Sequence, residues 1–299
     1  MNTHHATIKL SLSLIAIASV LSACSSSQTV EDQAGVAHYE SLSYKDIQWG
    51  ALNPARGDNS PRAGNLWGDR TGPGASGFLV QFVDGFSSPP HIHNITYRGV
   101  VINGLVHNDD PNAEEMWLPS GSFWTQPAGD THITAAQGQF NLAYIEIDEG
   151  PYLVKPTSEA FPSADVSINV DESNLVWLDA SSISWVDLPN HGGAASGTKI
   201  AWLWGDPQDD QPSGSLVQLP AGFQGEIRSH APSFHAVVIQ GTVTLHGDNT
   251  AGWTELEPGS YFGRAQNPNT PIAVSAHHQV MLYIRTDGRY EITANSEAP

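Results

Sequence analysis

The sequence predicts an all-β protein made of two tandem barrels, and three observations support this fold class. Gly and Pro are frequent, with 28 and 20 copies among 299 residues, whereas long runs of helix-forming residues are scarce. Short segments rich in Val, Ile, Phe and Tyr recur between turn residues. The chain also repeats itself, because a shift of 137 positions aligns its first half with its second.

The predicted strands are short apolar segments with turn residues at both ends. They include residues 78–83, 97–102, 139–147 and 279–285. After the first 23 residues no segment shows a clear apolar period of 3.6, although residues 30–43 could form a short helix. An antiparallel barrel of two sheets leaves few exposed strand edges, so we expect one barrel in each copy.

The internal repeat predicts the domain organisation. Similar segments meet when the two copies are aligned: Trp67-Gly68-Asp69 with Trp204-Gly205-Asp206, His93 with His230, residues 100–104 with 237–241, and, after one inserted residue, Gly121-Ser122-Phe123 with Gly259-Ser260-Tyr261. We therefore expect an N-terminal barrel over residues 39–160 and a C-terminal barrel over residues 161–299, joined near the polar run at residues 157–173.

The charge balance excludes two kinds of partner. There are 12 Lys and Arg against 31 Asp and Glu, which gives a net charge of −19. Because the basic residues are scattered singly, no basic stripe is available to neutralise phosphates, and nucleic acid is excluded. Electrostatic binding to an anionic membrane surface is excluded on the same ground.

The N-terminus predicts a secretory signal. Residues 10–22 form an apolar stretch behind Lys9 that is too short to span a bilayer. Residues 21–24, which end at the single cysteine Cys24, resemble the lipobox of bacterial lipoproteins. The resemblance implies a signal peptide over residues 1–23, lipidation of Cys24, a tether over residues 24–38 and a place in the bacterial cell envelope, facing the periplasm. By the same resemblance, Ser rather than Asp at position 25, directly after the cysteine, favours sorting to the outer membrane. An ordinary cleaved signal with an incidental cysteine is the alternative.

Three histidines of the first copy are candidate metal ligands. His91 and His93 are two residues apart, so on a strand both side chains point to the same face. The segment from Gly121 to His132 contains a Pro/Gly turn and supplies a third imidazole. Imidazole nitrogens hold divalent transition metals and suit Fe, Zn, Mn, Ni or Cu without choosing among them. The alternative is three histidines that pack in the core of a barrel without metal.

These residues resemble the two sequence motifs of the cupin superfamily. Gly85, His91, His93 and Gly104 match the first motif, G-x5-H-x-H-x3/4-E-x6-G, and Gly121, Pro127, Gly129 and His132 match the second, G-x5-P-x-G-x2-H-x3-N. The resemblance implies two cupin barrels, also called jelly rolls or double-stranded β-helices, with the metal motif in the first only. The run at residues 91–110 is also similar to a family of two-barrel cupin proteins, or bicupins, whose activity is uncharacterised.

Two motif positions depart from the cupin pattern. Tyr97 stands where cupins place Glu, or Arg98 if the longer spacing is counted, and Ala136 stands where they place Asn. Three neutral histidines would leave the ion its full positive charge and open coordination positions. Such a centre resembles the three-histidine iron sites of cupins that cleave diketones or oxidise thiols.

Tyr97 and Gln126 are the candidate catalytic residues. Counting by twos from His93 places Tyr97 on the inner face, where its hydroxyl could bind an anionic ligand or coordinate the ion as a phenolate. Gln126 lies on the strand before Pro127. For both residues, packing and hydrogen bonding in the core are the alternative. Three neighbouring aromatic residues are expected in the core or the pocket wall: Phe82, Phe123 and Trp124.

The second copy has lost the metal pattern. Arg228 replaces His91 and Phe234 replaces Tyr97, and residues 266–271 contain no histidine where His132 would fall. Arg228 beside His230 suggests a buried anion site or a packed core. Glu226, His230 and His235 could form a substitute site only if a bulge brought His235 to the same face. In the first copy, His107 is expected on the surface of a turn.

The sequence leaves three functional hypotheses open. The leading one is a metal-binding bicupin lipoprotein that acts as a dioxygenase or lyase on a small, oxygen-chelating molecule. The alternative is a non-catalytic module of the envelope that binds or senses a small ligand, and the third is a structural envelope protein. The expected partners are a small molecule and, through the lipid anchor only, a membrane. A homodimer formed by strand exchange is also considered, although two barrels in one chain could already satisfy that exchange.

Overall fold

β-strands and four short 3-10 turns make up the regular structure of the described chain, which contains no α-helix. The computed structural model describes residues 39–180, 183, 186–187, 197–206, 211–246, 253–264 and 272–295. The chain divides into two units, residues 1–36 and 37–299, and every described residue belongs to the second. In this part of the chain no helix has the length and hydropathy of a membrane span. The predicted signal, Cys24 and the tether lie outside it.

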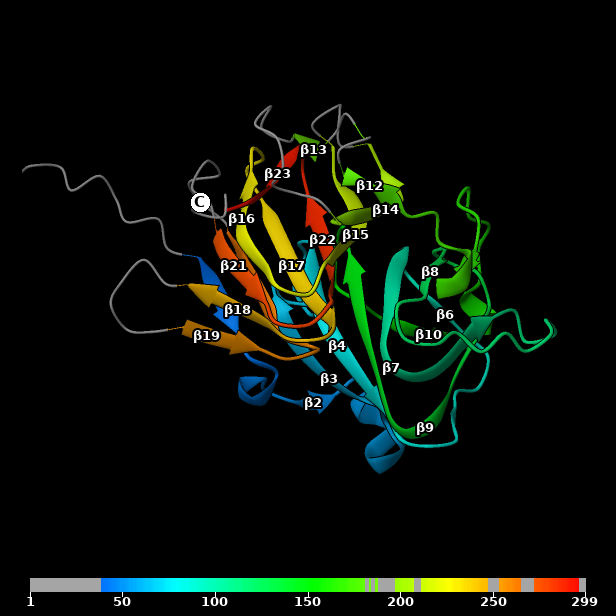
Figure 1. The fold of residues 1–299 in the computed structure, drawn as a ribbon. Coiled ribbons are helices and arrows are strands. Elements are labelled where there is room, and N and C mark those ends of the chain that lie inside the picture. The colour runs from blue at the N-terminus through cyan, green and yellow to red at the C-terminus, as the bar shows by residue number, and fades with distance from the viewer. Residues whose placement is uncertain are drawn as a thin grey trace, which may run out of the picture. The chain divides into compact units, whose positions relative to one another are not determined.

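The first copy forms an antiparallel barrel (Figure 1). Its larger sheet has eight strands in the order β11-β8-β7-β9-β4-β3-β2, with β5 paired to β9, and β6 pairs with β10 in a second sheet. The bounds are β2 (Gly50–Ala51), β3 (Arg62–Trp67), β4 (Ser76–Phe82), β5 (Phe86–Ser87), β6 (His91–His93), β7 (Tyr97–Asp109), β8 (Phe123–Gln126), β9 (Ile133–Ile147), β10 (Val154–Pro156) and β11 (Ile168–Val170). The 3-10 turns are η1 (Tyr44–Asp46), η2 (Pro54–Asn59), η3 (Thr157–Glu159) and η4 (Glu172–Asn174).

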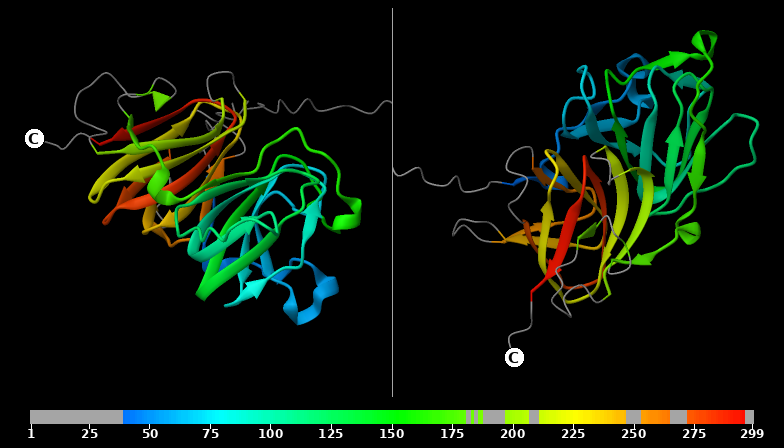
Figure 2. Two further views of the ribbon diagram at one scale, coloured as in Figure 1. Left: turned by 90° about the vertical axis from the view of Figure 1, so that its right-hand side faces the viewer. Right: turned by 90° about the horizontal axis from the view of Figure 1, so that it is seen from above.

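The second copy forms two sheets of its own, and Figure 2 shows its yellow to red strands as a separate barrel. The strand orders are β1-β20-β17-β22-β15-β14-β12 and β13-β23-β16-β21-β18-β19. The bounds are β1 (Glu40–Leu42), β12 (Leu178–Asp179), β13 (Val186–Asp187), β14 (Lys199–Gly205), β15 (Ser213–Leu219), β16 (Phe223–Ser229), β17 (Phe234–Gln240), β18 (Val243–His246), β19 (Trp253–Leu256), β20 (Tyr261–Arg264), β21 (Ile272–Ala276), β22 (Val280–Thr286) and β23 (Tyr290–Ala294). The predicted all-β fold of two tandem barrels is therefore confirmed.

The longest strands of the first barrel bend where the sequence suggested that they end. β7 and β9 pair from Tyr97 to Asp109, with register shifts around Asn103. Gly104 adopts a φ of 79°, and a Cβ at this position would collide with the side chain of Asn141. The strands predicted over residues 97–102 and 139–147 exist but are longer than predicted, because this glycine bends the chain within the sheet. The short helix considered over residues 30–43 is replaced by β1 in the part of that segment that is described.

The first strand of each copy pairs with a strand of the other copy. β1 precedes the first barrel but pairs with β20, and β11 precedes the second barrel but pairs with β8. The turns that follow are held in the same way: the hydroxyl of Ser260 accepts from the backbone N–H of Tyr44 at 3.0 Å, and Ser122, its counterpart in the repeat, accepts from Glu172 at 3.0 Å. The chain thus contains a reciprocal strand exchange, while the domain boundary at residue 160 stays a prediction.

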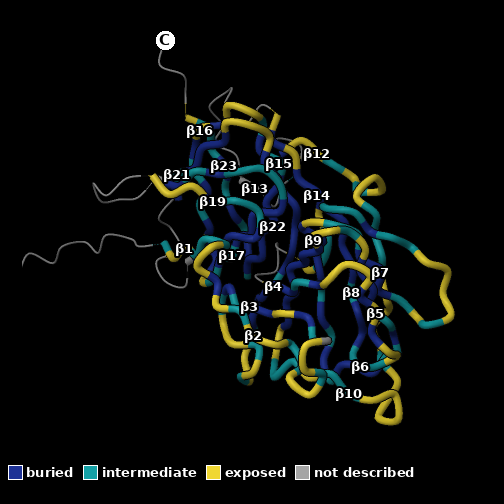
Figure 3. Tube along the Cα trace, turned by 90° about the horizontal axis from the view of Figure 1, so that it is seen from below, coloured by how far each residue is buried: buried dark blue, intermediate teal, exposed yellow. Residues whose placement is uncertain are grey.

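Three apolar clusters hold this arrangement together. One fills the first barrel, a second fills the second barrel, and a third joins the two copies. Members of the joining cluster include Leu79, Phe123 and Tyr144 from the first copy and Leu216 and Tyr283 from the second. Figure 3 shows the strands mainly as buried and the connecting loops as exposed. The side chains that line a site are therefore presented from a packed scaffold.

Candidate metal centre

Two backbone links bring the histidine motifs together. His91 and His132 exchange a pair of backbone hydrogen bonds, each 3.0 Å long, although they are far apart in sequence. The N–H of Gly129 donates to the carbonyl of His93 at 2.8 Å. Gly129 has a φ of 78°, so the turn after Pro127 needs a residue without a Cβ at this point. The second motif is thus fixed against β6, which carries the first.

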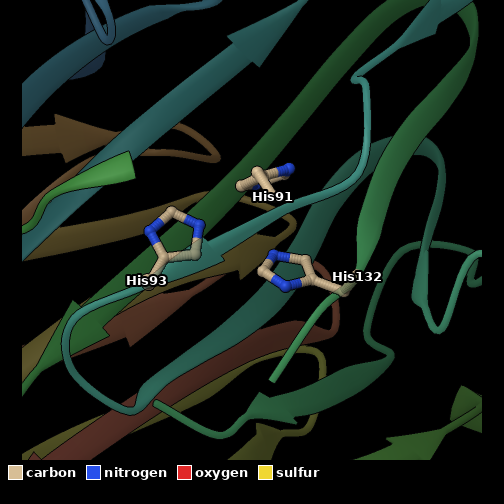
Figure 4. Close-up of side chains that lie close together, drawn as sticks. All are labelled: His91, His93 and His132. Carbon is tan, nitrogen blue, oxygen red and sulfur yellow. The ribbon is translucent and has the colours of Figure 1, made fainter. Parts of the chain in front are cut away.

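The three predicted histidines converge. Their ligand atoms all lie within 4.8 Å of one another, and Figure 4 shows the rings of His91, His93 and His132 around a common space. The ring centroids are 5.0 Å apart for His91 and His93, 4.3 Å for His91 and His132, and 5.1 Å for His93 and His132. The spacing of two residues in β6 does place both rings on one face. In the described residues, this is the only group with the composition and spacing of a metal site.

Backbone carbonyls fix the tautomer of every ring. The Nδ1 atoms of His91, His93 and His132 lie 3.0, 3.1 and 3.1 Å from the carbonyl oxygens of Pro89, Leu153 and Asp130. A carbonyl only accepts hydrogen bonds, so each Nδ1 carries the proton and each Nε2 keeps its lone pair. Metal-binding histidines are oriented by contacts of this kind. The donor set therefore fits a divalent cation bound by three Nε2 atoms.

Burial keeps these rings neutral. His93 and His132 are 1% exposed. Burial, followed by the neighbouring imidazoles, lowers the pKa of His93 well below its ordinary range. Burial and the proximity of His91 lower the pKa of His132 to about 3, and burial also lowers the pKa of His91. A neutral imidazole is the form that binds a metal ion, so these rings are ready to coordinate without losing a proton.

Tyr97 lies beside the histidines, on the inner face as predicted. Its hydroxyl is 3.4 Å from Nε2 of His132 and donates to Oδ1 of Asn108 at 2.9 Å. Burial raises the pKa of this phenol. In the structure Tyr97 is therefore a protonated hydrogen-bond donor at the edge of the cluster.

Gln126 lies opposite Tyr97 in the β7–β8 ladder, and its side chain binds Asn108, which also accepts from Tyr97. The amide nitrogen of Asn108 donates to Oε1 of Gln126 at 2.8 Å, and Nε2 of Gln126 lies 3.3 Å from the carbonyl of Asp130. That carbonyl also accepts from His132. Gln126 is consequently placed to orient Asn108 and the segment that holds His132.

Two residues of the site escaped the sequence analysis. Asn108 is 1% exposed and also accepts from the hydroxyl of Thr134 at 2.8 Å, so it joins Tyr97, Gln126 and Thr134. Tyr152 stacks on His93 with 4.4 Å between ring centroids, and its hydroxyl lies 3.3 Å from Nε2 of that ring. Neither residue belongs to a cupin motif, and Asn108 directly follows His107, which was expected on the surface of a turn. The expected turn surface at His107 was wrong, because β7 continues and buries that side chain to 2% exposure.

A cavity of about 430 Å³ opens beside the histidines. His91, His93, Tyr97 and Tyr152 contribute to its lining. Of the aromatic residues expected in core or pocket wall, Phe82 and Trp124 line this cavity, while Phe123 packs between the barrels. A small molecule could therefore lie against both the ligand nitrogens and an apolar wall.

The second barrel has no equivalent centre in its described part. Its interior is filled by apolar side chains such as Ile227, Phe234 and Leu245. The side chains of Arg228 and His230 are 38% and 36% exposed and pair with Glu291, so the suggested buried anion site or packed core at this position is wrong. Burial of Arg228 would leave its charge poorly solvated, and the strand instead turns it outward.

The proposed substitute site also does not form. His235 stacks on Trp67 with 4.0 Å between ring centroids, and its Nδ1 lies 2.9 Å from the hydroxyl of Tyr261. Glu226 and His230 instead belong to the partly exposed group of ion pairs on β16 and β23. Residues 266–271 lie outside the described residues.

Solved structures identify the class of this fold. A candidate dioxygenase from Nostoc punctiforme is 17% identical, with a TM-score of 0.58 over 87% of each chain. A salicylate 1,2-dioxygenase from Pseudaminobacter salicylatoxidans is 15% identical, with a TM-score of 0.51 over 86% of this chain and 88% of that one. Protein Ylba from Escherichia coli is 12% identical, with a TM-score of 0.54 over 84% and 92%. At these identities the likeness establishes the fold alone, which is the two-barrel cupin fold.

The chain belongs to the family described as Domain of unknown function (DUF4437), whose model matches residues 40–293. Among curated proteins, none matches the chain significantly. The family thus covers both barrels and states no activity.

Proposed function

We propose that the first barrel binds a divalent transition metal through His91, His93 and His132, and that the protein is a metal-dependent, dioxygenase-like enzyme. The observation that carries this proposal is that a backbone carbonyl holds each of the three imidazole rings in the same way. Each Nδ1 is held by a carbonyl at 3.0 to 3.1 Å, so three neutral Nε2 atoms face one point. The ion is Fe, Zn, Mn, Ni or Cu, since imidazole accepts all of these.

The side chains around the centre have separate roles in this proposal. A bound ion supplies Lewis acidity toward a small molecule that chelates through oxygen. Tyr97 holds a proton on its hydroxyl and donates a hydrogen bond at the edge of the cluster, while Asn108 and Gln126 orient it. The apolar wall of the cavity excludes water from the bound molecule.

The substrate class is proposed from the cavity and supported by one solved enzyme of the same fold. That enzyme is named a salicylate 1,2-dioxygenase, and it has also been solved with gentisate. Both molecules are small and carry adjacent oxygen donors, in agreement with an oxygen-chelating substrate. We also propose that Cys24 is lipidated and anchors the protein in the bacterial envelope, facing the periplasm, with the lipobox resemblance as support.

Metal analysis followed by oxygen uptake tests the proposal. The mature chain, taken as residues 25–299, is expected to contain metal when purified, and its His93→Ala variant is expected to contain little. The metal-bearing protein, reconstituted with Fe(II), is then assayed with diketones, thiols, catechols, salicylate and gentisate. Oxygen consumption with one of these classes supports the enzyme. Negligible metal in both proteins would overturn the metal centre, and metal without any turnover would favour a module that binds or senses a small ligand.

A further inference from the structure

The charged side chains that line the cavity are all basic. Apart from its histidines, the lining contains Arg56 and Lys155 and no Asp or Glu. The whole chain, by contrast, carries a net charge of −19. A positive lining in an acidic protein focuses field lines and concentrates anions in the cavity. The described cavity is thus electrostatically unlike the rest of the molecule.

Arg56 is the residue of this pair whose charge is free to bind a ligand. It lies in η2, which begins after Asn53, and Oδ1 of Asn53 accepts from the N–H of Ala55 at 3.2 Å. The guanidinium lies 5.4 Å from the centroid of the Phe86 ring, which also lines the cavity. Among the described residues no carboxylate pairs with Arg56, whereas Lys155 pairs with Glu159 at 2.8 Å.

Arg56 lies at the same cavity as the candidate metal centre, because His91 and His93 also contribute to its lining. A ligand that touches the histidine cluster at one end can therefore extend toward Arg56.

The remaining wall is suited to a flat apolar body. Phe82, Phe86, Trp124 and Tyr152 contribute aromatic faces or edges, and Ile145 adds an aliphatic surface. A volume of about 430 Å³ is at the lower end of the range for small-molecule sites, so it suits a ligand of about one ring. The planar fork of arginine matches the two oxygens of a carboxylate.

We propose that Arg56 is the anion-binding residue of this cavity and that the substrate is a small carboxylate with an aromatic or similarly flat apolar body. This assignment rests on the proposed function, because it gives the ligand of the same site. The carboxylate pairs with the guanidinium, the ring lies against Phe86 and its neighbours, and an oxygen donor carried by the ring faces His91 and His93. Arg56 is accordingly a specificity-determining residue and is separate from the metal ligands.

The test is ligand binding without turnover. Salicylate and its uncharged analogue salicylamide are titrated by calorimetry into the mature chain, once metal-free and once loaded with Zn(II), which does not support oxidation. The variants are Arg56→Gln, Arg56→Lys and, as the matched control, Lys155→Gln, which removes the lining cation that already has a partner. Metal content and circular dichroism are recorded for each variant, so that a loss of folding is recognised.

The expected result is a preference of the wild type for salicylate over salicylamide by at least about tenfold, since hydrogen bonds to charged groups are among the stronger ones. Arg56→Gln abolishes the preference, Arg56→Lys retains part of it, and Lys155→Gln keeps most of it. Equal salicylate affinity in Arg56→Gln and the wild type overturns the proposal. A wild type that binds neither salicylate nor salicylamide overturns it as well. A wild type that takes up no Zn(II) overturns the metal centre instead, and the metal-free titration then still decides the role of Arg56.

Discussion

Glu146 and Arg285 occupy equivalent positions in the two copies and form an ion pair with each other. Glu146 lies opposite Gly77 in the β4–β9 ladder, Arg285 lies opposite Gly214 in the β15–β22 ladder, and the repeat aligns the two glycines. Nη1 of Arg285 is 3.4 Å from Oε1 of Glu146, and the two side chains are 5% and 1% exposed. The repeat has therefore placed opposite charges at one position of its two copies.

Two further contacts near this pair also join a residue of one copy to a residue of the other. Arg98 lies 3.7 Å from the ring centroid of Trp204 in the other copy, and His235, the counterpart of Arg98, stacks on Trp67. Two identical copies would bring like charges together at the position of Glu146, which is costly in a buried interface. We infer that the interface between the two barrels requires different residues at equivalent positions, so that each barrel pairs with the other one of the same chain. A homodimer, which was considered from the sequence, would have to use another surface.

Glu146→Gln should destabilise the protein strongly. The carboxylate accepts from the hydroxyls of Tyr144 and Tyr283 at 3.1 and 2.7 Å, as well as pairing with Arg285. Loss of one partner leaves a buried charge without full compensation, so we expect a loss of about 3 kcal/mol in the free energy of unfolding. Urea unfolding measures it. Lys155→Gln, which breaks an exposed pair, should cost less than about 1 kcal/mol. Equal losses in the two variants would contradict the structural role of Glu146.

Asn108→Leu should disturb the site although Asn108 lies outside both cupin motifs. The substitution leaves the hydroxyls of Tyr97 and Thr134 and the amide of Gln126 without their buried partner, at a cost of about 1–3 kcal/mol for each group that stays unsatisfied. Tyr97→Phe removes one member of the same network. We expect the two losses to be less than additive in the double variant, because the variants share one hydrogen bond. Additive losses in urea unfolding would show that the network does not act as a unit.

The sequence predicted the parts of the site that depend on spacing along one strand or turn. His91 and His93 share a face because they are two residues apart, and the motif glycines bring His132 to them. Contacts between elements left no such local signal. Tyr152 reaches His93 from the segment after β9, 59 residues away in sequence. Its position depends on tertiary packing, and no motif in the sequence predicts that contact.

The same distinction explains the errors in the fold. The predicted strand ended at residue 102, before Gly104, because a glycine can either end a strand or bend it, and only pairing with the partner strand decides between the two. The sequence analysis did not single out Glu146 or Arg285, because their burial depends on contacts between the two copies. The crossed strands β1 and β11 were equally hidden, although exchange between copies had been considered.

His235 should make folding stability depend on pH. Burial, followed by the charge of Arg285, lowers its pKa from the ordinary 6.5 to about 3. Between these values the unfolded imidazole binds a proton and the folded one does not, so stability falls as the pH falls through this window and rises with increasing pH. In metal-free protein, His235→Phe should reduce the slope between pH 4 and pH 6 by about 1.4 kcal/mol per pH unit. Tyr261→Phe, which removes only the hydrogen bond to the ring, should keep the wild-type slope. An unchanged slope in His235→Phe would contradict the lowered pKa.

Metal should stabilise the fold through His132. A ligand that binds only the folded state raises the free energy of unfolding by about 2.7 kcal/mol when its concentration is 100 times its Kd. We expect added Zn(II) to raise the urea midpoint of the wild type in this way and to leave His132→Ala unchanged. His278→Ala, which removes an exposed histidine outside the cluster, serves as the control and should respond like the wild type. A Zn(II) response retained in His132→Ala would place the metal elsewhere.

Cys24→Ser should release the protein from the membrane. If Cys24 is acylated, the wild-type protein starts at that residue, carries the mass of its acyl chains and partitions into detergent, because two or more chains hold a protein stably at a bilayer. The serine variant has no thiol to modify and should stay in the aqueous phase. Ser25→Asp is the matched control: it should keep the lipid mass while shifting the protein between inner and outer membrane fractions. A wild-type chain whose intact mass shows no lipid would establish the ordinary cleaved signal, and the periplasmic placement would then rest on secretion rather than on an anchor.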